Sequence, residues 1–365
     1  MCKFGFSHIL GNEQSKKYLS QVALSSDVPQ SIVITGEEGI GKLDLAEQFA
    51  LALLCENPSE NGACGECNSC LSYKSKQNPN INFWHPKGQN TTIDQMRALK
   101  ENAIYPPLKG KYKINIIQKG DTLNDEASNS ILKIIEEPPT YLINILLYNN
   151  PHNILQTIRS RSIVVNLNPV KSEIIENYIS QNYDLPQDFV KFVSAYSMGS
   201  PGKAKYMAEN EKREELRDLI FNVINSVINK PMEILYLADA LGNKSNYFSD
   251  TGKLSMDEIK NDVKNSWNYP INCEISSGEA VLWAIDMISL MFRDMLLVKS
   301  GSEDNFINLD KKEEITFLSQ KLSEEKIITA IHILWETKDK LKANINTSVA
   351  LQAMLCKMLI ELKRQ

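Results

Sequence analysis

Apolar residues in the first half of the chain fall into short continuous runs separated by stretches with helical spacing. The runs at residues 31–36, 111–118, 141–150 and 162–168 are rich in β-branched side chains, which is typical of buried strands. Residues 42–55 and 123–137 carry apolar side chains every three or four positions, and Pro138 and Pro139 end the second helix. Strands that alternate with helices predict a parallel sheet with helices on both faces.

After about residue 168 the chain shows almost only helical periodicity. A turn is predicted at residues 198–204, and long amphipathic helices are predicted near residues 213–229, 280–299, 324–342 and 347–363. Residues 243–272 are polar and aperiodic, and we expect an excursion between helices there. The fold class is therefore α/β followed by all-α.

Composition and charge narrow the class of protein. A chain of 365 residues, 42% hydrophobic and 23% charged, is expected to be an ordinary globular protein of two or three domains. Its longest apolar run, at 280–299, is interrupted by Asp286, Arg293 and Asp294, so we expect a buried helix and no membrane span. No secretory signal is recognised, which favours a cytoplasmic location. A net charge of -5 argues against a protein that coats nucleic acid unaided.

Four of the seven cysteines, Cys55, Cys64, Cys67 and Cys70, occur in one short stretch. Two C-x-x-C steps that share Cys67 favour a tetrahedral metal over disulfides in a reducing compartment. Four thiolates suit Zn²⁺, and a closed set of sulfur ligands without a nearby histidine predicts a structural ion. The alternative is a loop of free thiols.

Residues 36–42, GEEGIGK, have the spacing of a phosphate-binding loop between a strand and a helix. Gly36, Gly39, Gly41 and Lys42 preserve the cradle for phosphates, but Leu43 replaces the Ser or Thr that binds Mg²⁺.

An acidic pair is also expected at the end of the next core strand, where Gln118 and Lys119 stand instead. Only a register shift could bring Asp121 into that place, and Leu43 would still lack a hydroxyl. We expect little or no hydrolysis by this chain. Either ATP binds weakly through Gly41 and Lys42, or the glycines serve only the tight turn.

Several motifs together resemble one protein family. FSHILGNEQSKKYL at residues 6–19, the loop TGEEGIGK, the cysteine module after the loop helix, NSILKIIEEPP at 129–139 and TIRSRS at 157–162 are similar to the bacterial clamp-loader subunits of DNA polymerase III. The delta-prime branch is the most similar. The resemblance covers about the first 205 residues strongly, and NINTSVALQAMLCKML at 344–359 is similar to the last helices of the family's collar.

The resemblance implies three domains and a set of partners. It implies an AAA+ nucleotide-binding-like domain at residues 1–168 with a zinc module at 55–70, a helical lid at 169–210 and a helical collar at 211–365. In that family the gamma or tau and delta subunits complete a hetero-pentamer, which loads a sliding clamp onto primed DNA. Gamma or tau binds ATP, and delta-prime acts as a rigid stator.

The family motif S-R-C appears here as Ser160, Arg161 and Ser162. The resemblance therefore implies that Arg161 is an arginine finger for the ATP site of a neighbouring subunit, an effect worth about 10³ to 10⁵ in rate where it operates. Arg159 is the competing candidate, and an ordinary surface ion pair is the alternative for both.

Other family positions also depart from those of active members. The lid motif G-S-x-R carries Gly202 in place of its sensor arginine, with Lys203 beside it, and Asn149 stands near the other sensor position. In the family, the helices that correspond to one basic stretch of this chain line the chamber that receives DNA. A solvated charged face is the favoured interpretation of the basic residues in that stretch. That stretch contains Arg97, Lys100, Lys109, Lys111 and Lys113.

Two other functions fit parts of the sequence. An active ATPase of gamma or tau type is opposed by the missing hydroxyl, acidic pair and sensor arginine. A stand-alone zinc protein or nucleotide-binding regulator would behave as a monomer and would not need the collar.

Overall fold

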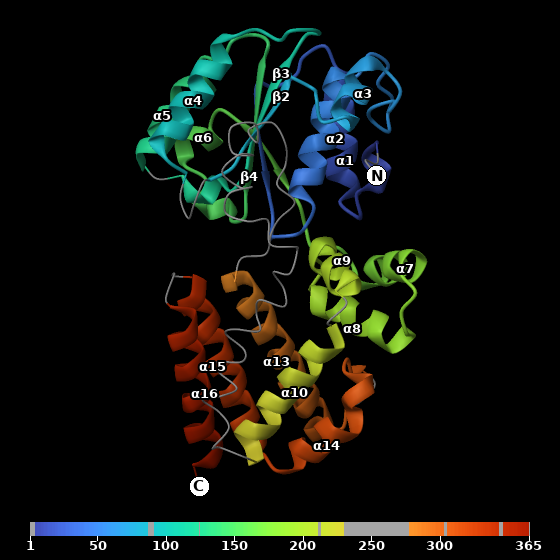
Figure 1. Cartoon of the computed structure of the whole chain (residues 1–365), viewed down its shortest axis with the longest axis vertical. Coiled ribbons are helices and arrows are strands. Elements are labelled where there is room, and N and C mark those ends of the chain that lie inside the picture. Colours follow the sequence, from blue (N-terminus) through green and yellow to red (C-terminus); the bar gives the residue numbers. More distant parts are fainter. Residues whose placement is uncertain are drawn as a thin grey trace. The chain divides into compact units, whose positions relative to one another are not determined.

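The computed structural model describes residues 4–86, 91–123, 125–210, 213–229, 277–302, 305–342 and 346–364. These residues belong to two compact units (Figure 1), the first formed by 4–175 with 199–202 and the second by 176–198 with the described residues from 203 onward. The polar segment predicted at 243–272 lies outside the described residues. The division into three domains stays a prediction.

A parallel five-stranded sheet forms the centre of the first unit, with strand order β2-β3-β4-β1-β5. The strands are β1 (Ser31–Thr35), β2 (Ile81–Trp84), β3 (Lys113–Ile117), β4 (Leu142–Tyr148) and β5 (Ile163–Asn166). This arrangement confirms the predicted α/β class, a parallel sheet with helices on both faces. The sequence analysis did not predict β2, an edge strand of four residues.

Helices cover both faces of this sheet (Figure 1). One face packs against α1 (Glu13–Leu24), α2 (Lys42–Leu54) and α3 (Asn68–Lys74), and the other against α4 (Ile93–Ile104), α5 (Asp125–Glu136) and α6 (Gln156–Arg159). Ile32 and Ile34 in β1 point to the α2 side, whereas Val33 between them joins the α5 side. Strand side chains alternate between faces, so a strand that is buried on both faces is mostly apolar.

A row of polar side chains crosses the buried sheet at paired positions. Asn82 is opposite Asn115, which is opposite Asn144, which is opposite Ser31. Asn115 Nδ2 donates to Asn144 Oδ1 at 3.2 Å, and the indole of Trp84 donates to Asn115 Oδ1 at 3.2 Å. A slip by one residue would bury these groups against apolar neighbours, so the row helps to fix the strand register.

The second unit is helical, as predicted. Its segments are most of α7 (Ser172–Asn182), α8 (Gln187–Ser197), most of α9 (Pro201–Glu209), α10 (Arg213–Asn229), α13 (Ser277–Ser300), α14 (Lys312–Gln320), α15 (Glu324–Lys342) and α16 (Thr347–Lys363). α15 packs between α13 and α16.

The two acidic residues that interrupt the apolar run in α13 are buried and paired. Asp286 contacts Lys338 and lies 3.4 Å from the amine of Lys203. Asp294 is fully buried and accepts the backbone N–H of Asn308 at 2.8 Å. No described helix is both long and apolar enough to cross a membrane.

Candidate functional site

The loop between β1 and α2 has the backbone shape of a phosphate cradle. Gly36, Gly39 and Gly41 have φ values of 152°, 74° and 100°, which disfavour any residue with a Cβ. Gly41 is the N-cap of α2, so the loop leads directly into a helix N-terminus. Such an end directs backbone N–H groups and a partial positive charge toward an anion. The backbone of this loop could therefore receive an anion, and phosphate binding through Gly36, Gly39, Gly41 and Lys42 stays a prediction.

The side chains of this loop depart from those of a metal-dependent ATP site. The amine of Lys42 donates to the carbonyl oxygens of Gly36 at 2.7 Å and Glu37 at 2.8 Å. Leu43 packs on the core beneath the loop and supplies no oxygen at the position that would hold Mg²⁺.

A segment far along the sequence lies across the loop within the first unit. Ser200 Oγ donates to the carbonyl of Glu38 at 3.1 Å, and Gly202 N donates to the carbonyl of Gly39 at 2.8 Å. A Cβ at Gly202 would lie 2.9 Å from the oxygen of Gly39, so a larger residue would displace the loop. Gly202, at the position where the resemblance predicts a sensor arginine in other members, thus permits this close contact because it lacks a side chain.

Asp121 lies in a short 3-10 turn after β3, close to the expected acidic pair, but its carboxylate accepts hydrogen bonds from a neighbouring loop. It accepts the N–H groups of Asn149 at 2.5 Å and Asn150 at 3.1 Å, and the side-chain amide of Asn153 at 3.1 Å. Those bonds tie the loop after β4 to the end of β3. Asn149, the residue near the predicted sensor position, thus contributes its backbone to this cap.

Arg161 lies just beyond α6 and is partly exposed. Its Nη1 donates to Thr157 O and to Ser160 Oγ, both at 3.2 Å, and its Nη2 lies 3.2 Å from Glu136 Oε1. Arg159 is exposed in the last turn of α6. Sequence reasoning did not find Glu136, because its approach to Arg161 joins positions 25 residues apart in the chain.

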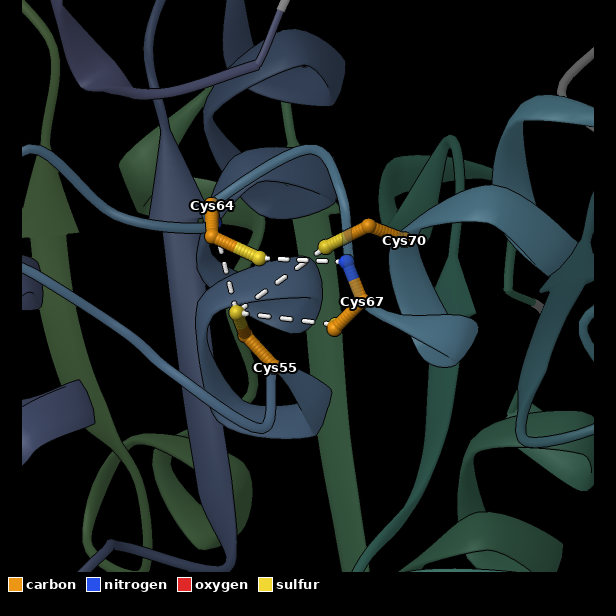
Figure 2. A group of neighbouring side chains, drawn as sticks. All are labelled: Cys55, Cys64, Cys67 and Cys70. Carbon is orange, nitrogen blue, oxygen red and sulfur yellow. Dashed lines mark hydrogen bonds between the residues drawn. The ribbon is translucent and has the colours of Figure 1, made fainter.

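The four cysteines predicted as metal ligands converge at one point (Figure 2), where their sulfur atoms all lie within 4.8 Å of one another. Cys55 Sγ lies 3.9 Å from the sulfurs of both Cys67 and Cys70. A tetrahedral ion with metal–sulfur bonds of about 2.3 Å holds its sulfurs about 3.8 Å apart. The thiols can therefore hold a metal ion with little rearrangement.

Backbone N–H groups favour the thiolate at part of this cluster. Hydrogen bonds from the backbone of Glu66 and Cys67 lower the pKa of Cys64 to about 7, whereas burial raises the pKa values of Cys55 and Cys70. A bound cation would deprotonate all four thiols, so metal binding is expected to release protons.

The cysteine loop is anchored to the start of the chain. Phe6 N donates to the carbonyl of Asn61 at 2.7 Å, and Gly5 N donates to Gln48 Oε1 in α2 at 2.7 Å. A Cβ at Gly62 or Gly65 would contact the rings of Phe6 or Phe4 at 3.3 and 3.1 Å. The cluster therefore couples the N-terminal segment to α2 and α3.

The basic stretch does not form a continuous exposed surface. Lys113 is buried, and its amine donates to the carbonyls of Asn102 at 2.6 Å and Tyr105 at 3.1 Å. Arg97 pairs with Asp94 at 3.2 Å, and Lys111 lies over the ring of Tyr112. Among the basic residues of this stretch, Lys113 therefore stabilises the protein and is not available at the surface.

Known proteins resemble both ends of the chain. Residues 11–171 match the family described as "DNA polymerase III, delta subunit", and residues 263–361 match "DNA polymerase III, delta subunit, C terminal". DNA polymerase III subunit delta' of Bacillus subtilis is 25% identical over 313 residues, 85% of each chain. Subunit tau of the same organism is 26% identical over 92% of this chain, which spans only 58% of tau.

A solved structure, a DNA polymerase III gamma-subunit-related protein of Thermotoga maritima, aligns with 96% of this chain and 100% of its own. Its TM-score is 0.46 and its identity 19%. The sequence matches cover the sheet with its glycine-rich loop and extend to the last helices. The chain belongs to the DNA polymerase III delta-subunit family, as a delta-prime-like clamp-loader subunit.

Proposed function

We propose that this subunit does not hydrolyse ATP and instead completes the ATP site of a neighbouring subunit. The observation that carries the proposal is the chemistry of its own loop. Leu43 cannot ligate Mg²⁺, and the nearest acid to the expected pair, Asp121, caps the backbone of Asn149 and Asn150. Hydrolysis needs a metal-held phosphate and a positioned water, and the described side chains around this loop supply neither.

Nucleotide binding by this loop is weak at most under the proposal. The glycine backbone and the N-terminus of α2 could still attract a phosphate, but without a metal ligand the charge of a triphosphate is only partly offset. The contact of Ser200 with Glu38 also holds the loop in its present shape.

Arg161 is the proposed arginine finger acting in trans. The backbone at this position is held in place because Ile158, three residues earlier, is fully buried, while the side chain of Arg161 is 42% exposed. A cation held at the surface on a fixed base can reach a phosphate presented by another chain. It would stabilise the charge that develops on the γ-phosphoryl group during transfer.

The ion held by Cys55, Cys64, Cys67 and Cys70 is proposed to be Zn²⁺. Sulfur spacing near 3.9 Å and four thiols without another ligand type fit a closed structural site. The ion would stabilise the connection of α2, α3 and the N-terminal segment and would take no part in chemistry.

The proposed partners are gamma or tau and delta subunits in a hetero-pentamer, with the sliding clamp and primed DNA bound through the complex. The exposed apolar side chains of the last helix are consistent with an assembly surface: Val349 is 59% and Ile360 is 61% exposed on α16. A cytoplasmic location follows from this role.

Reconstitution with the partner subunits of the same organism tests the proposal. The isolated chain should show no Mg²⁺-dependent ATP hydrolysis, whereas the complete complex should hydrolyse ATP. Arg161→Ala should lower ATP turnover by the complex without preventing its assembly. Arg159→Ala tests the competing candidate, and a loss of turnover in that variant alone would assign the role to Arg159. Hydrolysis by the isolated chain that is abolished by Lys42→Ala would instead identify an active ATPase of gamma or tau type.

A further inference from the structure

Glu136, the last residue of α5, contacts the guanidinium of Arg161. Glu136 Oε1 lies 3.2 Å from Arg161 Nη2, and the two side chains are 41% and 42% exposed. The pair joins the end of α5 to the segment after α6, two elements that also pack against each other. This contact does not involve the glycine-rich loop at residues 36–42 or the cysteine cluster.

The local structure fixes both partners. Pro138 and Pro139 prevent α5 from continuing, so Glu136 lies at a defined helix end. On the other side, Arg161 Nη1 is held by Thr157 O and Ser160 Oγ. The guanidinium is therefore held by the Thr157 carbonyl and the Ser160 hydroxyl on one edge and by the Glu136 carboxylate on the other.

The position of Glu136 is unfavourable for its own helix. A carboxylate in the last turn faces the negative end of the helix dipole, and Glu137 adds a second charge beside it. Arg161 offsets this repulsion for Glu136. Helix stability alone thus gives no reason for an acid here, whereas orientation of a nearby cation does.

The contacts leave donors available for a ligand. An arginine has five N–H donors; among the described residues, hydrogen bonds to Thr157 and Ser160 use two of them, and the ion pair of Nη2 with Glu136 engages a third. Two donors remain on a guanidinium whose rotation is already restricted. A phosphate oxygen from outside the chain could accept them without breaking the existing contacts.

We propose that Glu136 is a positioning residue for Arg161. It restricts the guanidinium before a neighbouring subunit presents its nucleotide, so less side-chain freedom is lost on the way to the transition state. This inference rests on the proposed role of Arg161 as an arginine finger. Glu136 itself touches no reacting atom.

A double-mutant cycle in the reconstituted complex tests the inference. Glu136→Ala should lower kcat for ATP by about two- to fivefold, the range expected for one partly exposed ion pair, with KM for ATP unchanged. Glu136→Gln keeps an acceptor oxygen and should fall between Ala and the unchanged protein. Glu137→Ala, an exposed neighbour of equal charge, should leave kcat unchanged.

The cycle separates positioning from a general structural effect. In an Arg161→Ala background, Glu136→Ala should have no further effect on kcat. An equal loss in both backgrounds, an unchanged kcat, or a faster enzyme after Glu136→Ala would each overturn the inference. If Glu136→Ala does not fold, Glu136→Gln decides by the same comparison. An Arg161→Ala complex with normal turnover would instead refute the proposed finger, a result distinct from all of these.

Discussion

The carboxylate of Asp121 accepts the backbone N–H of Asn149, so the acid after β3 closes the loop after β4. Two further donors, from Asn150 and Asn153, complete this cap. Because the carboxylate of Asp121 accepts three hydrogen bonds from one neighbouring loop, it holds that loop in place. The position closest to the missing acidic pair is thereby used for structure.

Asp121→Asn is expected to lower the free energy of unfolding by about 1–2 kcal/mol, because it removes the charge from these hydrogen bonds. ATP turnover by the assembled complex should not change. Urea denaturation and an ATPase assay measure the two effects, with Asp27→Asn on the surface as the control. A large loss of turnover in a stable, assembled variant would show that Asp121 takes part in catalysis.

Removal of the metal should loosen the first unit. We expect about one equivalent of zinc in freshly purified, reduced protein, and Cys67→Ser should leave less than about half an equivalent and lower the Tm. Cys356→Ser replaces an exposed cysteine outside the cluster and should retain both zinc and Tm. Full stability of a zinc-free protein would contradict a structural ion.

Glu47 should make stability depend on pH. Burial raises its pKa from the model-compound value of 4.5 to about 7, although the hydroxyl of Tyr73 donates to its carboxylate at 2.6 Å. The folded protein therefore binds a proton more readily than the unfolded chain. This contribution to stability is complete below about pH 4.5 and is lost as the pH rises through about 7.

Glu47→Gln removes this titration and keeps an acceptor for Tyr73. The variant should gain stability relative to the unchanged protein between pH 5 and pH 8, by up to about 3 kcal/mol. Chemical denaturation across that range measures the difference, and Glu101→Gln on the exposed face of α4 should show none. A difference that shrinks as pH rises would contradict the raised pKa.

Lys113→Met should destabilise the first unit by about 1–3 kcal/mol, because the carbonyls of Asn102 and Tyr105 would lose a charged donor within the protein. Lys111→Met, on an exposed neighbour, is the control. Thermal denaturation of the two variants compares them. Equal stability would show that the buried amine is not important for the turn after α4.

The local pattern of apolar and polar residues was sufficient to predict much of the fold. The runs that became β1, β3 and β4 are mostly apolar because both faces of the sheet are covered, and their length and β-branched content distinguish them from helices. The edge strand β2 was missed because it has four residues, one of them Asn82, and gives no period to detect.

For the candidate site, the sequence by itself determined which chemical groups exist. Glycines at 36, 39 and 41 permit the cradle, Leu43 removes a metal ligand, and four cysteines within sixteen residues can meet because the connecting loop is short. These conclusions depend only on the types of the residues and on their close neighbours in the sequence.

Only the tertiary structure decided what the polar groups contact. Asp121 meets Asn149, Ser200 meets Glu38, and Glu136 meets Arg161 because parallel strands and their crossover helices bring distant segments to one edge. The strength and direction of a hydrogen bond depend on distances of a few ångströms, which sequence spacing does not set for residues far apart in the chain.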